Sequence, residues 1–215
     1  IKSDSRFKGI NYLNGDFTDE DTLLKAQIKT AERALILADL SENFSALEND
    51  SRAVLAVITM KNLNPRIYCV AEIADSKFEK HLSLARCDEI ILSSDYEQNL
   101  LVQASSGKGM SHILRELIAG DSGAGIIIEP IPEEFVGKSY HDYRISLRTH
   151  DVLIGILENT GNFYQRRKEA LAEAQKNPDM EKIVANLKKV KTLQSNLPHF
   201  TPNDDYIVPG NSKAI

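Results

Sequence analysis

The sequence lacks the features of secreted, membrane-spanning and nucleic-acid-binding proteins. Its 215 residues include only two cysteines, Cys69 and Cys87, which cannot build a disulfide framework and are expected to be reduced cytosolic thiols. No apolar run approaches the roughly 20 residues that cross a bilayer, and residues 1–8 are too polar for a signal peptide. The formal net charge of −5 argues against a nucleic-acid partner, which more often meets a basic face.

Motifs of phosphate-binding, metal and dehydrogenase sites are also missing or misplaced. No Gly-x-Gly-x-x-Gly turn occurs, and Gly107-Lys108-Gly109 lacks the spacing of a phosphate loop, so it is expected to join two helices. The five histidines are scattered and show no metal-binding spacing. Neither Tyr140 nor Tyr143 has a lysine four residues on, as one class of oxidoreductase would require.

What the first half does contain is a regular alternation of apolar strands and amphipathic helices. This order predicts an α/β protein with half of a parallel, doubly wound sheet. The expected strands lie at residues 9–13, 33–39, 66–72 and 89–93, and the expected helices at 18–26, 44–61, 76–85, 94–104 and 110–118. The helix after residue 44 should end before Asn64-Pro65, because a residue that precedes proline disfavours the helical region. Ser94 or Asp95 is expected to cap the fourth helix.

The second half has a different pattern. The glycine-rich stretch 119–125 is the expected boundary between a domain of residues 1–120 and one of residues 121–215. Strands are expected at 125–129, 152–157 and 205–210, one helix at 137–147, and two further helices at 164–176 and 179–193. The lysines of the last two helices are interpreted as a solvated face rather than a nucleic-acid patch.

Three segments, in this order, resemble the RCK domains (regulators of potassium conductance, also called TrkA-type or KTN domains). Residues 12–19, with the letters YLNGDFTD, resemble the family's strand and turn. Val70-Ala71-Glu72 and the later run 84–91 resemble its VAE and aGaDeVi motifs, and residues 132–139 resemble the entrance to its C-terminal subdomain. Each motif is loose, but their succession over most of residues 7–158 is fairly specific.

The resemblance implies a Rossmann-like parallel sheet whose N-terminal part is incomplete, followed by a small α+β subdomain of TrkA-C type. The family's first strand, glycine-rich turn and second strand would lie upstream of Ile1. Arg86 stands where the family has a glycine, and residues 164–193 look like a helical insertion. A chain that begins with Ile rather than Met suggests a fragment or a processed product.

The resemblance also implies a function without catalysis. RCK domains form homodimers that assemble into an octameric ring at the cytoplasmic face of the membrane, next to a potassium-channel pore or a transporter's membrane subunit. Ligand binding in the ring biases pore opening. One alternative is a freestanding regulatory subunit of a Trk- or Ktr-type potassium uptake system, and an alternative from another class is an NAD-dependent oxidoreductase.

The residues that could bind a nucleotide lie at the carboxyl ends of the predicted strands, where ligands of doubly wound sheets bind. Gly15 and Asp16 match the family's Gly-Asp pair, which would line the pocket of an adenine nucleotide or NAD(H). A plain helix cap by Asp16 or Thr18 is equally consistent with the sequence. Asp39 would sit beside the nucleotide, and Ser41 would contact it from the next loop or serve with its neighbours as the cap of the following helix.

A cation site is the second possibility at this edge. Asp39 and Glu72 end neighbouring strands, and Asp75 could supplement them as ligands of Ca²⁺ or another cation, which takes six to eight oxygens. The alternative is that Glu72 pairs with a basic residue at a dimer interface. A separate stripe of apolar residues could be intrachain core or a dimer interface; it consists of Met110, Ile113, Leu114 and Leu117.

Overall fold

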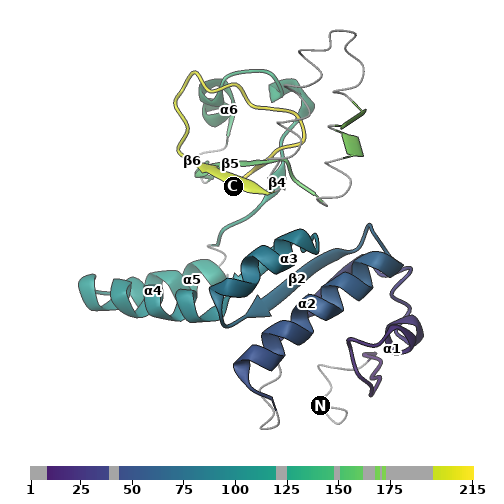
Figure 1. Cartoon of the computed structure of the whole chain (residues 1–215). Coiled ribbons are helices and arrows are strands. Elements are labelled where there is room, and N and C mark those ends of the chain that lie inside the picture. Colours follow the sequence, from purple (N-terminus) through teal and green to yellow (C-terminus); the bar gives the residue numbers. More distant parts are fainter. Residues whose placement is uncertain are drawn as a thin grey trace. The chain divides into compact units, whose positions relative to one another are not determined.

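The structure is a computed structural model, and it describes residues 9–38, 44–119, 125–147, 151–161, 168–169, 171–172 and 196–215 (Figure 1). The chain divides into two compact units, Ile1–Ser94 and Asp95–Ile215. This division assigns the helices after residue 94 to the second unit, whereas the sequence places them in a domain that ends near residue 120. No helix of the described residues is long and apolar enough to cross a membrane.

The first unit contains a parallel sheet of three strands, which confirms the α/β prediction. β1 (Arg33–Ile36), β2 (Tyr68–Ile73) and β3 (Glu89–Leu92) lie in that order, with Ala34 opposite Cys69 and Ala71 opposite Ile90. The strand predicted at residues 9–13 does not form. A strand requires a hydrogen-bonded neighbour, and within the described residues this segment pairs with none, leaving Ile10 and Leu13 exposed.

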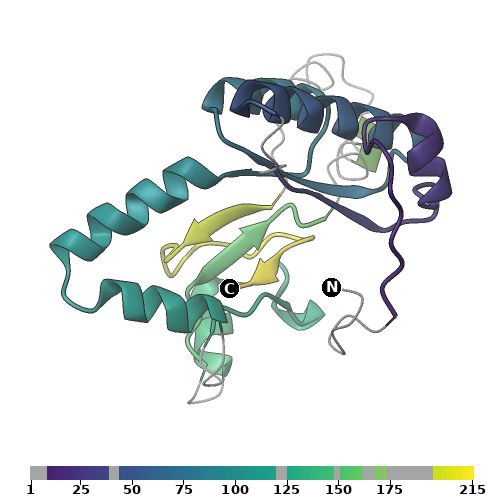
Figure 2. The same cartoon turned by 90° about the horizontal axis from the view of Figure 1, so that it is seen from below.

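The helices of this unit cover one face of the sheet. They are α1 (Glu20–Lys25), α2 (Ala46–Leu63), the short η2 (Ser76–Phe78) and α3 (Glu79–Leu84). In Figure 2 the blue helices lie on one side of the strands. Ile36, Ala71 and Ile73 face them and are buried, whereas Leu35 and Leu37 alternate to the other side and are each 61% exposed.

The ends of these helices follow from local sequence. Ser45 caps α2 in a capping box with Glu48, so residues 41–43 are not the cap of this helix. Asn64 ends α2, as the following proline predicts. The next helix, α4 (Ser93–Ser106), begins at Ser93, so the cap expected at Ser94 or Asp95 is wrong. The hydroxyl of Ser94 instead donates to the carbonyl of Ala74, 3.0 Å away.

Buried polar contacts join α2 to the start of β2 and to β3. The Lys61 ammonium donates to the Asp88 carboxylate and to the carbonyl of Ile67, both at 2.6 Å. Asp88 also accepts from the backbone N–H of Cys69 at 2.8 Å. Both cysteines are free thiols, and burial raises the pKa of Cys69 to about 11. A buried thiol with a raised pKa is poorly ionised and unreactive, which is consistent with the reduced cysteines predicted from the sequence.

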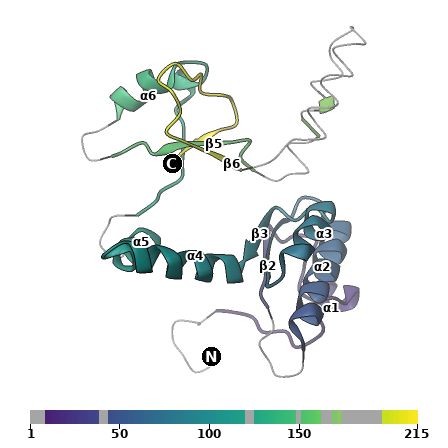
Figure 3. The same ribbon diagram turned by 60° about the vertical axis from the view of Figure 1, so that its left-hand side comes forward.

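The second unit contains the rest of α4, then α5 (Met110–Ala119) and an antiparallel sheet. Figure 3 shows α4 and α5 joined by a turn, where the Gly-Lys-Gly run was expected to join two helices. The sheet order is β4-β7-β5-β6. The strands and shorter helices are β4 (Glu129–Pro130), η3 (Glu133–Phe135), α6 (Tyr140–Ser146), β5 (Gly155–Glu158), β6 (Leu197–Phe200) and β7 (Lys213–Ala214).

The predictions for this unit are only partly correct. The helix expected at 137–147 is α6. Of the strand expected at 125–129, only Glu129 lies in a strand, β4, which continues into Pro130; the proline is tolerated because β4 is at the sheet's edge. The strand expected at 205–210 is wrong, since Ile207 makes only an isolated bridge with Ser139. The two helices predicted between 164 and 193 lie almost wholly outside the described residues. A separate core holds the unit together: Ile131, Tyr140, Tyr143, Leu153, Ile156, Val208 and Ala214.

Candidate functional site

The candidate site lies where β1 ends and α2 begins, beside the loop that precedes α1. Asp39 and Ser41 follow β1 directly and lie outside the described residues. Gly15 and Asp16 precede α1, and Arg52 of α2 reaches Asp16. Two chain segments, the loop before α1 and helix α2, therefore meet at Asp16.

Gly15 lies close to Thr22 of α1. A Cβ at this position would lie 2.7 Å from Cγ2 and 2.9 Å from Oγ1 of Thr22. A side chain here would therefore force the Thr22 side chain to move. The close approach that the sequence attributed to a ligand is made, in the structure, to the protein's own helix.

Asp16 does not cap α1, and neither does Thr18. The cap is Asp19, which accepts from the backbone N–H of Thr22 at 3.0 Å. Asp16 instead uses Oδ1 to accept three bonds, from the backbone N–H of Thr18 at 2.9 Å, its hydroxyl at 2.8 Å and Nη2 of Arg52 at 3.1 Å. Those bonds, the Thr18 N–H foremost and then the Thr18 hydroxyl and Arg52, hold the Asp16 pKa below its usual range.

The second oxygen of Asp16 is free to bind a ligand. Oδ2 accepts no hydrogen bond from the described residues, and the side chain is 49% exposed. An ionised carboxylate with one saturated and one open oxygen is a fixed acceptor for an N–H donor. This is the chemistry that the sequence assigned to Asp16 for an adenine amine.

Arg52 is a site residue that the sequence does not reveal. Its guanidinium carbon lies 4.9 Å from the ring centre of Phe17 and 4.6 Å from that of Phe44. The side chain is 23% exposed, and its buried Nε has no acceptor among the described residues. Asp16 and Arg52 are 36 residues apart, so no local spacing could have paired them.

The acids expected to bind a cation are engaged in local bonds. Glu72 Oε2 accepts from the backbone N–H of Ala38 at 3.1 Å, which ties the end of β2 to the end of β1. Asp75 caps η2 through the N–H of Lys77 and lies 3.4 Å from that residue's ammonium group. In the described part of the chain, no group of three or more His, Cys, Asp or Glu side chains could hold a metal. A cation site that includes Asp39 stays a prediction.

The loop that carries Asp75 is fixed from α2. Asp50, which is 1% exposed, accepts from the backbone N–H of Ala74 at 3.0 Å and from that of Asp75 at 2.9 Å. Two acceptors thus satisfy two backbone donors that follow β2. Asp50 is a second residue of α2 that the sequence did not single out.

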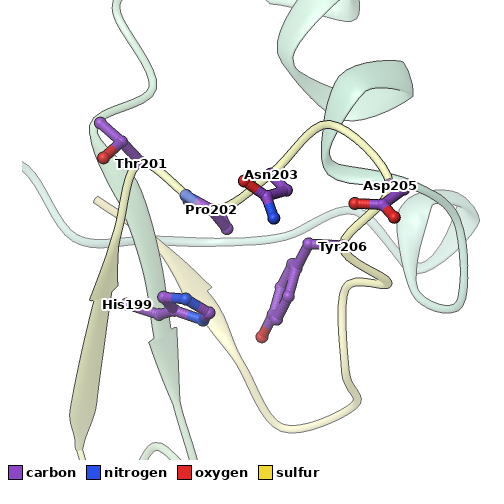
Figure 4. Close-up of a pocket in the computed structure, with 6 residues that line it drawn as sticks. All are labelled: His199, Thr201, Pro202, Asn203, Asp205 and Tyr206. Carbon is purple, nitrogen blue, oxygen red and sulfur yellow. The ribbon is translucent and has the colours of Figure 1, made fainter.

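The second unit has a shallow cavity of about 300 Å³. Figure 4 shows the rings of His199 and Tyr206 side by side below Asn203. The two ring centres are 4.8 Å apart, and Glu158 accepts from the Tyr206 hydroxyl and lies 3.5 Å from Nδ1 of His199. The sequence did not point to this cavity, whose lining residues are His199, Thr201, Pro202, Asn203, Asp205 and Tyr206.

Comparison with known proteins finds a family model that matches the first unit. Residues 3–93 match the TrkA-N domain. This match confirms the resemblance to RCK domains drawn from the motifs of the chain. That match covers the parallel sheet and includes Gly15, Asp16, Arg52 and Glu72.

Two relatives are named as potassium channels. The calcium-gated potassium channel TvoK of Thermoplasma volcanium is 28% identical over 111 residues, which are 51% of this chain and 32% of TvoK. YugO of Bacillus subtilis, named as a potassium channel protein, is 26% identical over 155 residues, or 72% of this chain and 47% of YugO. The chain thus spans less than half the length of either relative.

Solved structures of the GsuK channel also match the chain. The crystal structure of the GsuK RCK domain has 17% identity and a TM-score of 0.40, and the match covers 96% of this chain and 34% of that one. The GsuK channel bound to NAD has 15% identity and a TM-score of 0.40, with 96% of this chain and 29% of that one covered.

Proposed function

We propose that this chain is a ligand-sensing regulatory domain of a potassium channel and acts at the cytoplasmic face of the membrane. The observation that carries the proposal is the TrkA-N match over residues 3–93, together with two relatives that are named as potassium channels. Its action is a population shift, because a ligand that binds one domain geometry more tightly than another biases the pore by that difference. A freestanding subunit of a potassium uptake system would use the same mechanism on a separate membrane protein.

The ligand proposed for the first unit is an adenine nucleotide or NAD(H). The open oxygen Oδ2 of Asp16 supports this choice, because it can accept a hydrogen bond from the exocyclic amine of adenine. Asp39 and Ser41 would complete the contacts from the loop after β1. Ca²⁺ is the second candidate, and its support is the name of one relative, a calcium-gated channel.

We expect adenosine to bind the 215-residue chain and Asp16→Asn to weaken this binding by roughly 10- to 100-fold, the effect of losing a hydrogen bond to a charged group. The physical reason is geometric. The amide oxygen of Asn would stay with Thr18 and Arg52, so its NH₂ group would replace Oδ2 and could not accept from the amine. Amide shifts of residues 15 and 16 in an NMR titration measure the affinity.

Asp21→Asn is the matched control, because it removes a nearby acid, in the first turn of α1, without changing Asp16. N6,N6-dimethyladenosine, which has no exocyclic N–H, should bind the native chain as weakly as adenosine binds Asp16→Asn. Equal affinity of adenosine for the native chain and Asp16→Asn would refute the proposed contact.

The proposed partners are a second copy of the chain, an octameric ring of such dimers, and a channel pore. The surface of α4 and α5 supports self-association. α4 buries none of its residues, and Leu101 and Val102 on it are strongly exposed. On α5 no residue of the predicted stripe is fully buried, and Ile113 is 54% exposed. Exposed apolar residues gathered on two neighbouring helices are typical of an interaction surface.

Ile113→Asp should therefore convert a dimer of the 215-residue chain into a monomer, because it places a charge in the centre of the apolar stripe. Sedimentation velocity at a series of protein concentrations measures the change. Arg115→Asp alters an exposed residue of the same helix off that stripe and should leave the dimer intact. A monomeric native chain at high concentration would contradict this interface.

An NAD-dependent oxidoreductase is the rival from another class. Tyr164 and Lys168 do have the Tyr-x-x-x-Lys spacing of one such group. Tyr164 lies outside the described residues, so no geometry supports that reading. The two channel relatives favour a regulatory role without catalysis.

A further inference from the structure

Asp16 begins a strongly acidic segment, and Arg52 is placed against its first member. Asp19, Glu20 and Asp21 follow Asp16 within five positions. Arg52 comes from another element, α2, and forms an ion pair with Asp16 at 3.1 Å. A cation approaching Asp16 would therefore meet a guanidinium as well as carboxylates.

The position of Arg52 is fixed by more than this ion pair. Phe17 and Phe44 both lie against its guanidinium, at 4.9 and 4.6 Å, and such contacts favour a planar cation. In the part of the chain that the structure describes, the buried Nε donor has no acceptor, an arrangement that costs free energy and calls for an explanation. The ion pair with Asp16 and the two ring contacts support one explanation: Arg52 is held in this position to keep a positive charge beside Asp16.

We propose that Arg52 is the specificity-determining residue of this site: it compensates the charge of Asp16 through Oδ1 and leaves Oδ2 to accept from a neutral amine, so that the site selects an adenine-type ligand and excludes cations. The selection of adenine rests on the proposed function. The exclusion of cations rests only on the geometry of Arg52 and the acidic segment.

The physical distinction is between a hydrogen bond and a net charge. A neutral N–H donor needs one lone pair at a fixed place, and Oδ2 supplies it whether or not a cation sits at Oδ1. A bound cation requires uncompensated negative charge, because it must repay its own loss of hydration. Removing the guanidinium would leave Asp16, the first acid of this segment, without this compensation, whereas a lysine would retain the charge.

The test is an NMR titration of the 215-residue chain with calcium chloride and, separately, with adenosine. Arg52→Gln should bind Ca²⁺ at residues 16–21 at least about threefold more tightly than the native chain, the scale expected for one partly exposed charge pair. Arg52→Lys should behave like the native chain, because it keeps the charge although it lacks the planar group. Arg115→Gln removes one positive charge from the second unit and controls for net charge.

Spectra of each variant establish that it is folded before titration. The proposal is overturned if Arg52→Gln gains no Ca²⁺ affinity, or if Arg52→Lys gains as much. In either case adenosine shifts at residues 15 and 16 of the native chain would leave the nucleotide function standing. If adenosine fails to bind while Arg52→Gln gains Ca²⁺ affinity, the nucleotide function fails and the exclusion of cations by Arg52 is supported.

Discussion

Replacing Asp88 by alanine is expected to lower the free energy of unfolding by about 3–5 kcal/mol, the cost of removing one partner of a buried ion pair. The Asp88 side chain is fully buried and that of Lys61 is 5% exposed. Without the carboxylate, the ammonium of Lys61 would retain only the carbonyl of Ile67, and the N–H of Cys69 would lose its acceptor. Urea denaturation followed by circular dichroism measures the loss.

Two further variants test whether the loss of stability comes from leaving a buried charge without its partner. Lys77→Met removes the cation of an exposed pair, since Lys77 is 84% exposed, and should change stability little. The double variant Lys61→Met with Asp88→Leu should lose less than Asp88→Ala, because no buried charge is left alone. If Asp88→Ala were as stable as the native chain, the Lys61–Asp88 ion pair would not be what holds α2 against β2 and β3.

The sheet of the first unit is predictable because each of its strands coincides with a short apolar run in the sequence. The apolar runs at 34–38 and 67–71 fit parallel strands, and Pro65 fixes the end of α2. The segment 9–13 is also largely apolar, apart from Gly9 and Asn11, and forms no strand. Strand formation there depends on a neighbour in the sheet, which composition does not specify.

In the candidate site, too, some residues could be predicted from the sequence and others could not. Gly15 and Asp16 are visible in the sequence because they form a contiguous motif. The sequence leaves open whether Asp16 caps a helix, and the structure shows that Asp19 does so. Arg52 could not be paired with Asp16 from sequence, because the contact depends on how α2 packs beside the loop. The same holds for Asp50, whose partners follow it by 24 and 25 residues.

The last prediction concerns Asp50. Asp50→Ala should lower the free energy of unfolding by about 2–4 kcal/mol, because it strips the acceptors from two backbone N–H groups after β2. Hydrogen exchange of the Ala74 and Asp75 amides should accelerate more than exchange in β2 itself. Ser51→Ala is the control, because the Ser51 hydroxyl bonds only within its own helix, to the carbonyl of Leu47.

Asp50 and Arg52 lie in the same turn of α2 and hold two different loops. Asp50 fixes the loop after β2, and Arg52 fixes the loop before α1. If the two residues hold their loops independently, Asp50→Ala should speed hydrogen exchange at the amides of residues 74 and 75 and leave exchange at residues 15 and 16 unchanged. Faster exchange at both loops would instead mean that α2 couples them, which is the property a ligand sensor needs to pass binding at Asp16 to the rest of the sheet. Unchanged exchange at 74 and 75 would show that Asp50 holds neither.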